Sequence, residues 1–285
     1  MLLRTAGDVP GAAGGGAAAG GGGIHPAGGG ASGGGVADGG GASDGGGTHP
    51  GIEVYMLRRK RSMSFAAGAY VFPGGSVDGR DTDSDVAWAG PDVTDWARWL
   101  GSTAELARGL VCAAVRETFE ESGVLLAGAS ADDMTVPAEQ DLEADRLALL
   151  DRSLSLAGLL ASRRLVLRSD LLKPWARWIT PELESRRYDT RFFAAVLPAR
   201  QQTKEIRDEA DEVAWLRPAD VLALARDGEV FLMPPTAVTL AELADCGDIS
   251  AALAVPREIT PQRPEITVED GQAWLNMPAG LEYPI

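Results

Sequence analysis

The pattern of apolar and polar positions from residue 51 onward predicts strands that alternate with helices. Strands are predicted where short apolar runs rich in β-branched and aromatic residues end at charged or glycine-rich turns; these runs cover residues 52–57, 69–72, 124–126, 188–197 and 212–216. Helical spacing of apolar positions covers residues 104–122, 141–167 and 218–226. Because both kinds of element alternate within one chain, we expect a mixed α/β fold rather than a helical bundle or a β-sandwich.

The helix predicted over residues 104–122 carries the most informative surface. Ser102, Thr103 and Glu105 have the form of a capping box, and Gly123 suits a left-handed cap at the other end. At about 100° per residue, the face opposite the apolar one presents three carboxylates. They are Glu117, Glu120 and Glu121.

Three carboxylates this close raise one another's pKa unless a cation neutralises them. A site made only of oxygen atoms suits a hard divalent ion, Mg²⁺ or Mn²⁺. The glutamates also lie near the carboxyl end of the helix, where the helix dipole disfavours negative charge, so we expect positive charge nearby. The alternative is a solvated acidic face paired with Arg116 or Arg108.

Composition divides the chain in two. Residues 1–50 hold 21 of the 36 glycines and few large side chains, so they cannot recover the entropy lost on ordering and are expected to be disordered. Residues 51–285 are long enough for a sizeable core and are expected to form one domain.

Charge and residue counts exclude several classes of function. The net charge of −15 argues against binding of nucleic acid or of an anionic membrane. Both histidines, His25 and His49, precede the domain, which excludes a histidine-dependent nucleophile or a histidine-ligated metal there. Two cysteines and the lack of an apolar run of about eighteen residues favour a cytoplasmic protein.

Two motifs in a fixed order identify a family resemblance. Phe72-Pro73-Gly74-Gly75 precedes Arg116-Glu117-x-x-Glu120-Glu121-x-Gly123, and this combination resembles the signature of the Nudix hydrolase superfamily. The resemblance implies an α/β/α sandwich with a mixed β-sheet, here with an accessory helical insertion. It also implies a loop, a helix and a second loop that grip a metal-bound diphosphate.

The resemblance implies a role for each matching residue. Gly74 would offer its carbonyl oxygen to the metal, Glu120 and Glu121 would be the principal ligands, and Glu117 would be a further ligand or the base that orients water. Arg116 would hold the helix and the loop together. Glu209 or Glu212, in an acidic stretch before Trp215, would add a metal ligand or a base; a solvated acidic loop is the alternative.

Substrate contacts are expected from the loop and from the basic run that precedes it. Gly74 and Gly75 allow close approach of the backbone to a ligand, and Arg58 and Arg61 could contact phosphates. A basic run at the end of a strand can also be merely solvated, so this assignment stays open.

The chain departs from the usual pattern of the family in two places within the motif. About forty residues separate Gly75 from Arg116, and the family's glutamate two turns before the arginine is replaced by Arg108, for which Glu105 could substitute. Long insertions at this point resemble the branch of coenzyme A diphosphatases. That branch's coenzyme A signature is only partly matched.

The amino terminus departs from the pattern as well. The fold usually begins with a strand that forms a hairpin with the one predicted at residues 52–57. We therefore expect Met1-Leu2-Leu3-Arg4 to be the end of that strand, with Leu2 and Leu3 paired to residues 53–56.

The leading hypothesis is a hydrolase that uses Mg²⁺ or Mn²⁺ to cleave a phosphoanhydride in a nucleoside diphosphate linked to another moiety, such as coenzyme A or an acyl-coenzyme A. The alternative is a nucleotide-sensing module that has kept the fold and lost hydrolysis. Either implies a small-molecule partner, and the sequence leaves open whether the chain forms a homodimer.

Overall fold

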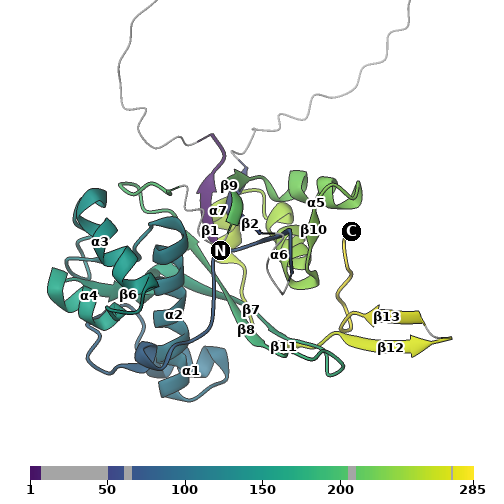
Figure 1. Cartoon of the computed structure of the whole chain (residues 1–285), viewed down its shortest axis with the longest axis horizontal. Coiled ribbons are helices and arrows are strands. Elements are labelled where there is room, and N and C mark those ends of the chain that lie inside the picture. The colour runs from purple at the N-terminus through teal and green to yellow at the C-terminus, as the bar shows by residue number, and fades with distance from the viewer. Residues whose placement is uncertain (8–50, 61–65, 205–209, 271) are drawn as a thin grey trace, which may run out of the picture.

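A computed structural model of the chain describes residues 1–7, 51–60, 66–204, 210–270 and 272–285. It has a mixed α/β architecture, as the sequence predicted, with a central sheet between two groups of helices (Figure 1). Helices α1 to α4 cover one face of the sheet, and α5 and α6 cover the other.

The central sheet has eight strands, and seven of them follow the order β10-β3-β2-β1-β8-β7-β11, while β9 pairs with β2. These strands are β1 (Leu2–Thr5), β2 (Ile52–Arg59), β3 (Ala69–Val71), β7 (Leu172–Ile179), β8 (Asp189–Val196), β9 (Ala210–Leu216), β10 (Phe231–Leu232) and β11 (Pro261–Gln262). The sheet is mixed, because β1 runs antiparallel to β2 and parallel to β8.

The expected amino-terminal strand is present. Leu3 is paired with Val54 and Arg4 with Glu53, which confirms the hypothesis of a hairpin between the first residues and β2. Leu2–Thr5 therefore belong to the same sheet as the residues after Gly51. The expectation of disorder over residues 1–50 is therefore wrong for Leu2–Thr5, which form a strand, and residues 8–50 lie outside the described residues.

Seven α-helices and two short 3₁₀ helices occur in the part of the chain that the structure describes. The α-helices are α1 (Val93–Leu100), α2 (Ala104–Ser122), α3 (Glu139–Leu150), α4 (Leu156–Arg163), α5 (Pro218–Arg226), α6 (Pro234–Asp245) and α7 (Ile249–Ala254); the 3₁₀ helices are η1 (Gly79–Thr82) and η2 (Ser169–Leu171). Helix α2 has the predicted bounds because Thr103 accepts a hydrogen bond from the Leu106 N–H and Gly123 adopts φ of 75°.

Alternation along the strands supplies two separate cores. Leu2, Tyr55 and Leu57 point to the face that carries α2, whereas Leu3 and Val54 point to the face that carries α5 and α6. Successive side chains of a strand lie on opposite faces, so a sheet covered on both sides needs apolar residues at consecutive positions. This explains why β2 is apolar at the four consecutive positions 54–57.

The chain between β3 and β7 differs from the prediction in two details. The helix expected over residues 141–167 is two helices, because Arg152 adopts φ of 65° and the Ser155 side chain caps α4. Residues 124–126, where a strand was expected, form none, and the strand β5 (Ala127–Gly128) follows directly after them. It joins β4 (Trp88–Ala89) and β6 (Val166–Arg168) in a small second sheet.

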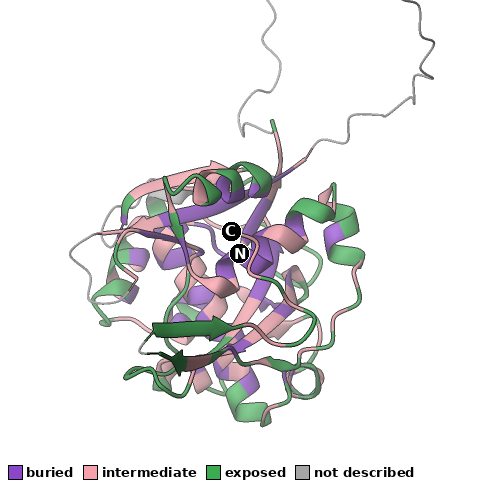
Figure 2. Cartoon of the chain, turned by 90° about the vertical axis from the view of Figure 1, so that its right-hand side faces the viewer, coloured by how far each residue is buried: buried purple, intermediate pink, exposed green. Residues whose placement is uncertain are grey.

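A hairpin near the carboxyl end stands apart from the central sheet. Strands β12 (Glu265–Glu269) and β13 (Gln272–Asn276) pair only with each other among the described strands, and the hairpin is exposed along most of its length (Figure 2). None of the helices described combines the length and the apolar character that a membrane span requires.

Candidate active site

Helix α2 and the loop after β3 together form one side of a cavity of about 280 Å³. All three predicted glutamates of α2 line it. The remaining lining residues come from β2, β3, the loop after β3, the end of α3 and the start of β9; they are Leu57, Arg59, Val71, Gly74, Gly75, Ser76, Asp78, Arg80, Arg116, Leu149, Leu150, Arg152 and Ala210.

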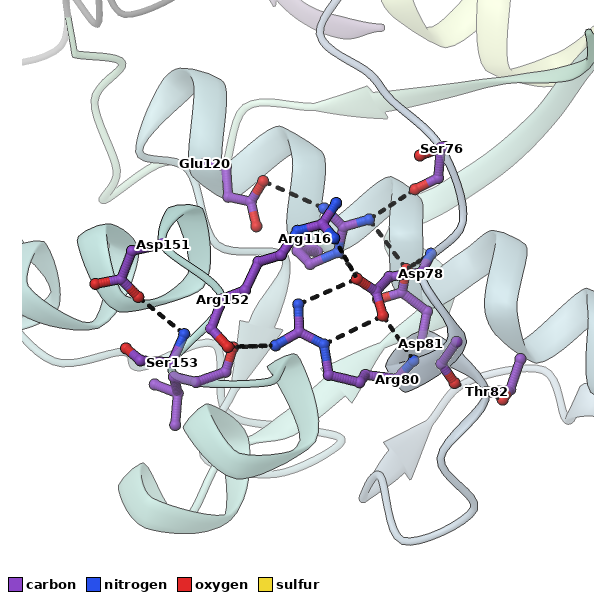
Figure 3. A network of polar contacts seen from close by, with 12 residues as sticks. Ser76, Asp78, Arg80, Asp81, Thr82, Arg116, Glu120, Asp151, Arg152 and Ser153 are labelled. Carbon is purple, nitrogen blue, oxygen red and sulfur yellow. Dashed lines mark hydrogen bonds and ion pairs between the residues drawn. The ribbon is translucent and has the colours of Figure 1, made fainter.

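Arg116 is the centre of a buried ionic network (Figure 3). Its Nε and Nη2 atoms donate to the two carboxylate oxygens of Asp81, each at 3.0 Å, and Nη2 also donates to the Ser76 carbonyl oxygen at 2.9 Å. Its Nη1 donates to Glu117 at 2.8 Å and to Glu120 at 3.2 Å. One guanidinium therefore ties the loop after β3 to α2.

The network holds more negative than positive charge. Arg116 is shared by three carboxylates, so the four groups carry a formal charge of −2 when all are ionised. Burial raises the pKa of Glu117 and of Glu120, and the adjacent Arg116 only partly opposes this shift. A further cation in the cavity would stabilise the ionised form of both glutamates.

The glycine loop fits closely against two of the glutamates. The Gly74 N–H donates to Glu121 Oε2 at 2.8 Å. At Gly75 a Cβ atom would lie 2.6 Å from Glu117 Cδ, well inside van der Waals contact. Glycine at this position therefore leaves the space that the Glu117 carboxylate occupies.

Positive charge lies at the carboxyl end of α2, as the helix dipole led us to expect. Arg146 of α3 is buried and donates from Nη1 to the Glu120 carbonyl oxygen at 3.0 Å. Arg146 also pairs with Glu143, whose other partner is Lys204. Arg80 is engaged elsewhere, since it pairs with Asp78 and donates to the carbonyl oxygens of Arg152 and Leu154.

The chemistry of the cavity fits a hard divalent cation. Its three glutamates offer only oxygen atoms, and two of them belong to the Arg116 network, which carries a formal charge of −2. Within the described residues, however, no group of three or more Asp, Glu, His or Cys side chains is already arranged to hold an ion. The carboxylates of Glu117 and Glu120 are turned toward Arg116, and each has one oxygen that the hydrogen bond from Arg116 does not use.

The structure brings together most of the residues predicted for the site, but not all. Glu117, Glu120, Glu121, Gly74 and Gly75 line one cavity with Arg116. Arg61 and Glu209 lie outside the described residues.

Arg58 and Glu212, by contrast, do not line the cavity. They pair with each other at 3.2 Å as direct neighbours on β2 and β9. The alternation of β2 turns Arg58 to the face opposite Leu57 and Arg59.

Asp81 was missed as the acidic partner of Arg116. The sequence suggested that Glu105 could replace the glutamate lost at Arg108, but Glu105 is exposed at the start of α2. The Arg108 guanidinium lies 5.5 Å from the centre of the Trp88 ring instead. No local pattern within α2 indicates Asp81, which lies 35 positions before Arg116.

Comparison with known proteins agrees with this arrangement. The model of the NUDT19 Nudix domain matches residues 101–243, which include all three glutamates. Acyl-coenzyme A diphosphatase NUDT19 of Xenopus laevis is 26% identical over 234 residues, which are 70% of this chain and 61% of that protein. Putative nudix hydrolase 7 of Caenorhabditis elegans is 28% identical over 201 residues, which are 68% of this chain and 57% of that protein.

A solved structure shares the fold. The crystal structure of a NUDIX hydrolase from Alicyclobacillus acidocaldarius is similar with a TM-score of 0.58 and 27% sequence identity, over 76% of this chain and 93% of that one. The chain spans about three fifths of the length of the curated relatives it matches. With the domain model covering half of the sequence and the glutamates of α2 inside it, the chain belongs to the Nudix family, in the NUDT19 Nudix domain group.

Proposed function

We propose that this protein hydrolyses the diphosphate linkage of coenzyme A or of an acyl-coenzyme A, using Mg²⁺ or Mn²⁺. The observation that carries the proposal is the cavity lined by Glu117, Glu120 and Glu121. Two of these glutamates share Arg116 with Asp81, and that network has excess negative charge. The substrate class is supported by the similarity to acyl-coenzyme A diphosphatase NUDT19 of Xenopus laevis.

In the proposed reaction, Glu120 and Glu121 would hold the divalent cation, and Glu117 would be a further ligand or the base. When bound, the cation would neutralise charge on the diphosphate and make water a better nucleophile. The chain's own groups provide the positioning, because the Gly74 N–H orients Glu121 and Arg116 orients Glu117 and Glu120.

Glu117 is the candidate base. Its Oε1 accepts the hydrogen bond from Arg116, and its Oε2 accepts none from the described residues. Burial raises the pKa of Glu117, which makes its carboxylate a better proton acceptor than an exposed glutamate. Oε2 would take the proton of the attacking water as the phosphoanhydride bond breaks.

The test is product analysis by chromatography after incubation with coenzyme A, an acyl-coenzyme A, ADP-ribose or NADH, with either metal and with chelator. We expect release of 3',5'-ADP from the coenzyme A substrates only, and no product with chelator. Glu121→Gln should lower turnover about 10²-fold or more, the scale for losing one electrostatic contact in an active site.

Glu105→Gln is the matched control, since it makes the same change on an exposed turn of the same helix and should retain full turnover. Equal turnover by Glu121→Gln and wild type would refute the assignment of the metal site. Binding of these nucleotides without turnover in either metal would favour the nucleotide-sensing alternative.

A further inference from the structure

Arg59, at the end of β2, is a cavity-lining arginine whose side chain has no ion-pair partner among the described residues. Its Nε atom is buried and makes no hydrogen bond. Two other arginines also leave Nε unbonded, but Arg191 places Nη1 2.6 Å from Asp189, and Arg257 places Nη1 2.7 Å from Glu242. No described carboxylate lies within ion-pair distance of Arg59. A buried donor without an acceptor costs free energy, so its retention calls for a reason.

The register of β2 explains why Arg59 faces the cavity while its neighbour does not. Leu57 and Arg59 are two residues apart and both line the cavity. Arg58 lies between them and pairs across the strands with Glu212. The pairing with β9 shifts between Arg58 and Arg59, so that Arg59 is opposite Ala210. Such a bulge redirects a side chain, and here Ala210 places no large side chain beside Arg59.

The other guanidiniums of the cavity wall are already engaged. Arg116 is bonded to Asp81, Glu117 and Glu120, and Arg80 is bonded to Asp78. The side chain of Arg152 is 75% exposed and reaches Asp78 only at 4.0 Å. Among the described arginines of the wall, Arg59 is therefore the one with a buried donor that has no acceptor, whereas Arg152 is largely in solvent.

We propose that Arg59 binds a phosphate group of the diphosphate substrate, an inference that rests on the proposed function. A guanidinium presents planar, paired N–H donors that match two phosphate oxygens, and it is weakly enough hydrated to be used in a partly buried wall. Arg59 would supply the positive charge on the substrate side of the cavity, while the glutamates of α2 supply the negative charge for the cation. Its neighbour Arg58 would take no part.

The experiment compares wild type with Arg59→Ala, Arg59→Lys and the matched control Arg58→Ala, which removes the same side chain one position earlier on the same strand. Binding of ADP in Mg²⁺ is measured by calorimetry, with adenosine as the ligand that lacks phosphates. Michaelis constants for an acyl-coenzyme A are measured alongside.

We expect Arg59→Ala to weaken ADP binding about tenfold to a hundredfold, the loss for a hydrogen bond to a charged group, and to raise KM more than it lowers kcat. Arg59→Lys should restore only part of the affinity, because an ammonium cannot bind two oxygens in one plane. Arg58→Ala should bind ADP within about twofold of wild type, and adenosine binding should be the same in all variants.

The outcomes separate this proposal from the proposed function. An Arg59→Ala variant with unchanged Kd and KM would overturn the role of Arg59, even if wild type hydrolyses the substrate. ADP binding that depends on Arg59, in a protein that hydrolyses none of the substrates, would support the phosphate site and overturn the hydrolase. Equal losses of ADP affinity in Arg58→Ala and Arg59→Ala would also overturn the role of Arg59. So would an absence of ADP binding by wild type.

Discussion

The two faces of the central sheet carry the same kinds of charged residue but pair them differently. On the face covered by α5 and α6, Arg58 and Glu212 form a one-to-one ion pair, half exposed at the end of the strands. On the face covered by α2, one buried arginine is shared by Asp81, Glu117 and Glu120. The first arrangement has no net charge, so it needs no further ion. The second has unbalanced charge in a cavity, and this imbalance, rather than the presence of charged residues, distinguishes the candidate site.

Of these changes, removal of Arg116 from the α2 face should destabilise the protein most. Arg116→Met leaves the buried Asp81 carboxylate without its ion-pair partner, so we expect the free energy of unfolding to fall by about 3–5 kcal/mol. Urea denaturation of the purified protein measures it. Arg177→Met is the control, since Arg177 pairs with the partly exposed Asp189 and should cost about 1 kcal/mol or less. Similar losses for both arginines would contradict the central role of the buried network.

A subtler change in the same face should affect turnover more than stability. In Gly75→Ala the new methyl group overlaps the Glu117 carboxylate, which must move away. If the protein is the proposed hydrolase, we expect turnover to fall about tenfold to a hundredfold, the scale for misplacing a catalytic group by about 1 Å. Steady-state kinetics measures it. Gly79→Ala is the matched control in the same loop, where a Cβ would meet no atom within 4 Å. An equal loss of turnover in Gly79→Ala would mean that the effect does not come from the position of the Glu117 carboxylate.

On the opposite face, disrupting the balanced pair should have little effect. Arg58 and Glu212 are 41% and 46% exposed, so Arg58→Ala should cost less than about 1 kcal/mol of stability and leave turnover unchanged. A double-mutant cycle with Glu212→Ala should give a coupling energy of about 0.5 kcal/mol. A tenfold loss of turnover in Arg58→Ala would show that both faces contribute to the site.

The smallest effect is expected from an ion pair at the margin of the α2 face. Hydrogen bonds from Arg146, and then from Lys204, lower the pKa of Glu143 from its ordinary 4.5 to about 2. Because the folded-state pKa is the lower one, the pair stabilises the protein above about pH 4.5, and this contribution is lost as the pH falls toward 2.

Glu143→Gln should therefore lower the melting temperature slightly at pH 7 and hardly at pH 2, with the free-energy difference under about 1 kcal/mol because solvent screens the partly exposed carboxylate. Thermal unfolding at both pH values measures it. Glu105→Gln, on the exposed first turn of α2, serves as the control. A difference that persists unchanged at low pH would rule out the ion pair as its cause.

Elements with strong local signals could be predicted from the sequence, and those fixed by distant contacts could not. Helix α2 carries its own caps and β8 its own apolar run, so both were predicted to within a residue or two. Helix α1 and the small second sheet were missed. The two-residue strands of that sheet exist only because β6 lies beside them, and no pattern within β4 or β5 indicates it.

The site shows the same division. The glutamates of α2 were found because helical spacing places them on one face. Asp81 lies 35 positions before Arg116, and only the folding of the long connection brings them together. Arg58 and Arg59 are adjacent basic residues, and the sequence analysis named Arg58 as a phosphate contact although Arg59 is the one that lines the cavity. Which of them reaches the cavity depends on the register of β2 with β9.

Strand β1 has a practical consequence for dividing the molecule. Its four residues lie between β2 and β8, with Leu2 in one core and Leu3 in the other, although residues 8–50 separate β1 from β2 along the chain. A shortened protein that begins at Gly51 would leave a slot in the middle of the sheet, with unpaired backbone donors and acceptors on both sides. Cleavage within the glycine-rich segment would instead yield a short peptide that contains β1 and a large fragment that contains the rest of the sheet, with complementary surfaces. This segment is thus the natural point at which to split the protein into two fragments that can be recombined.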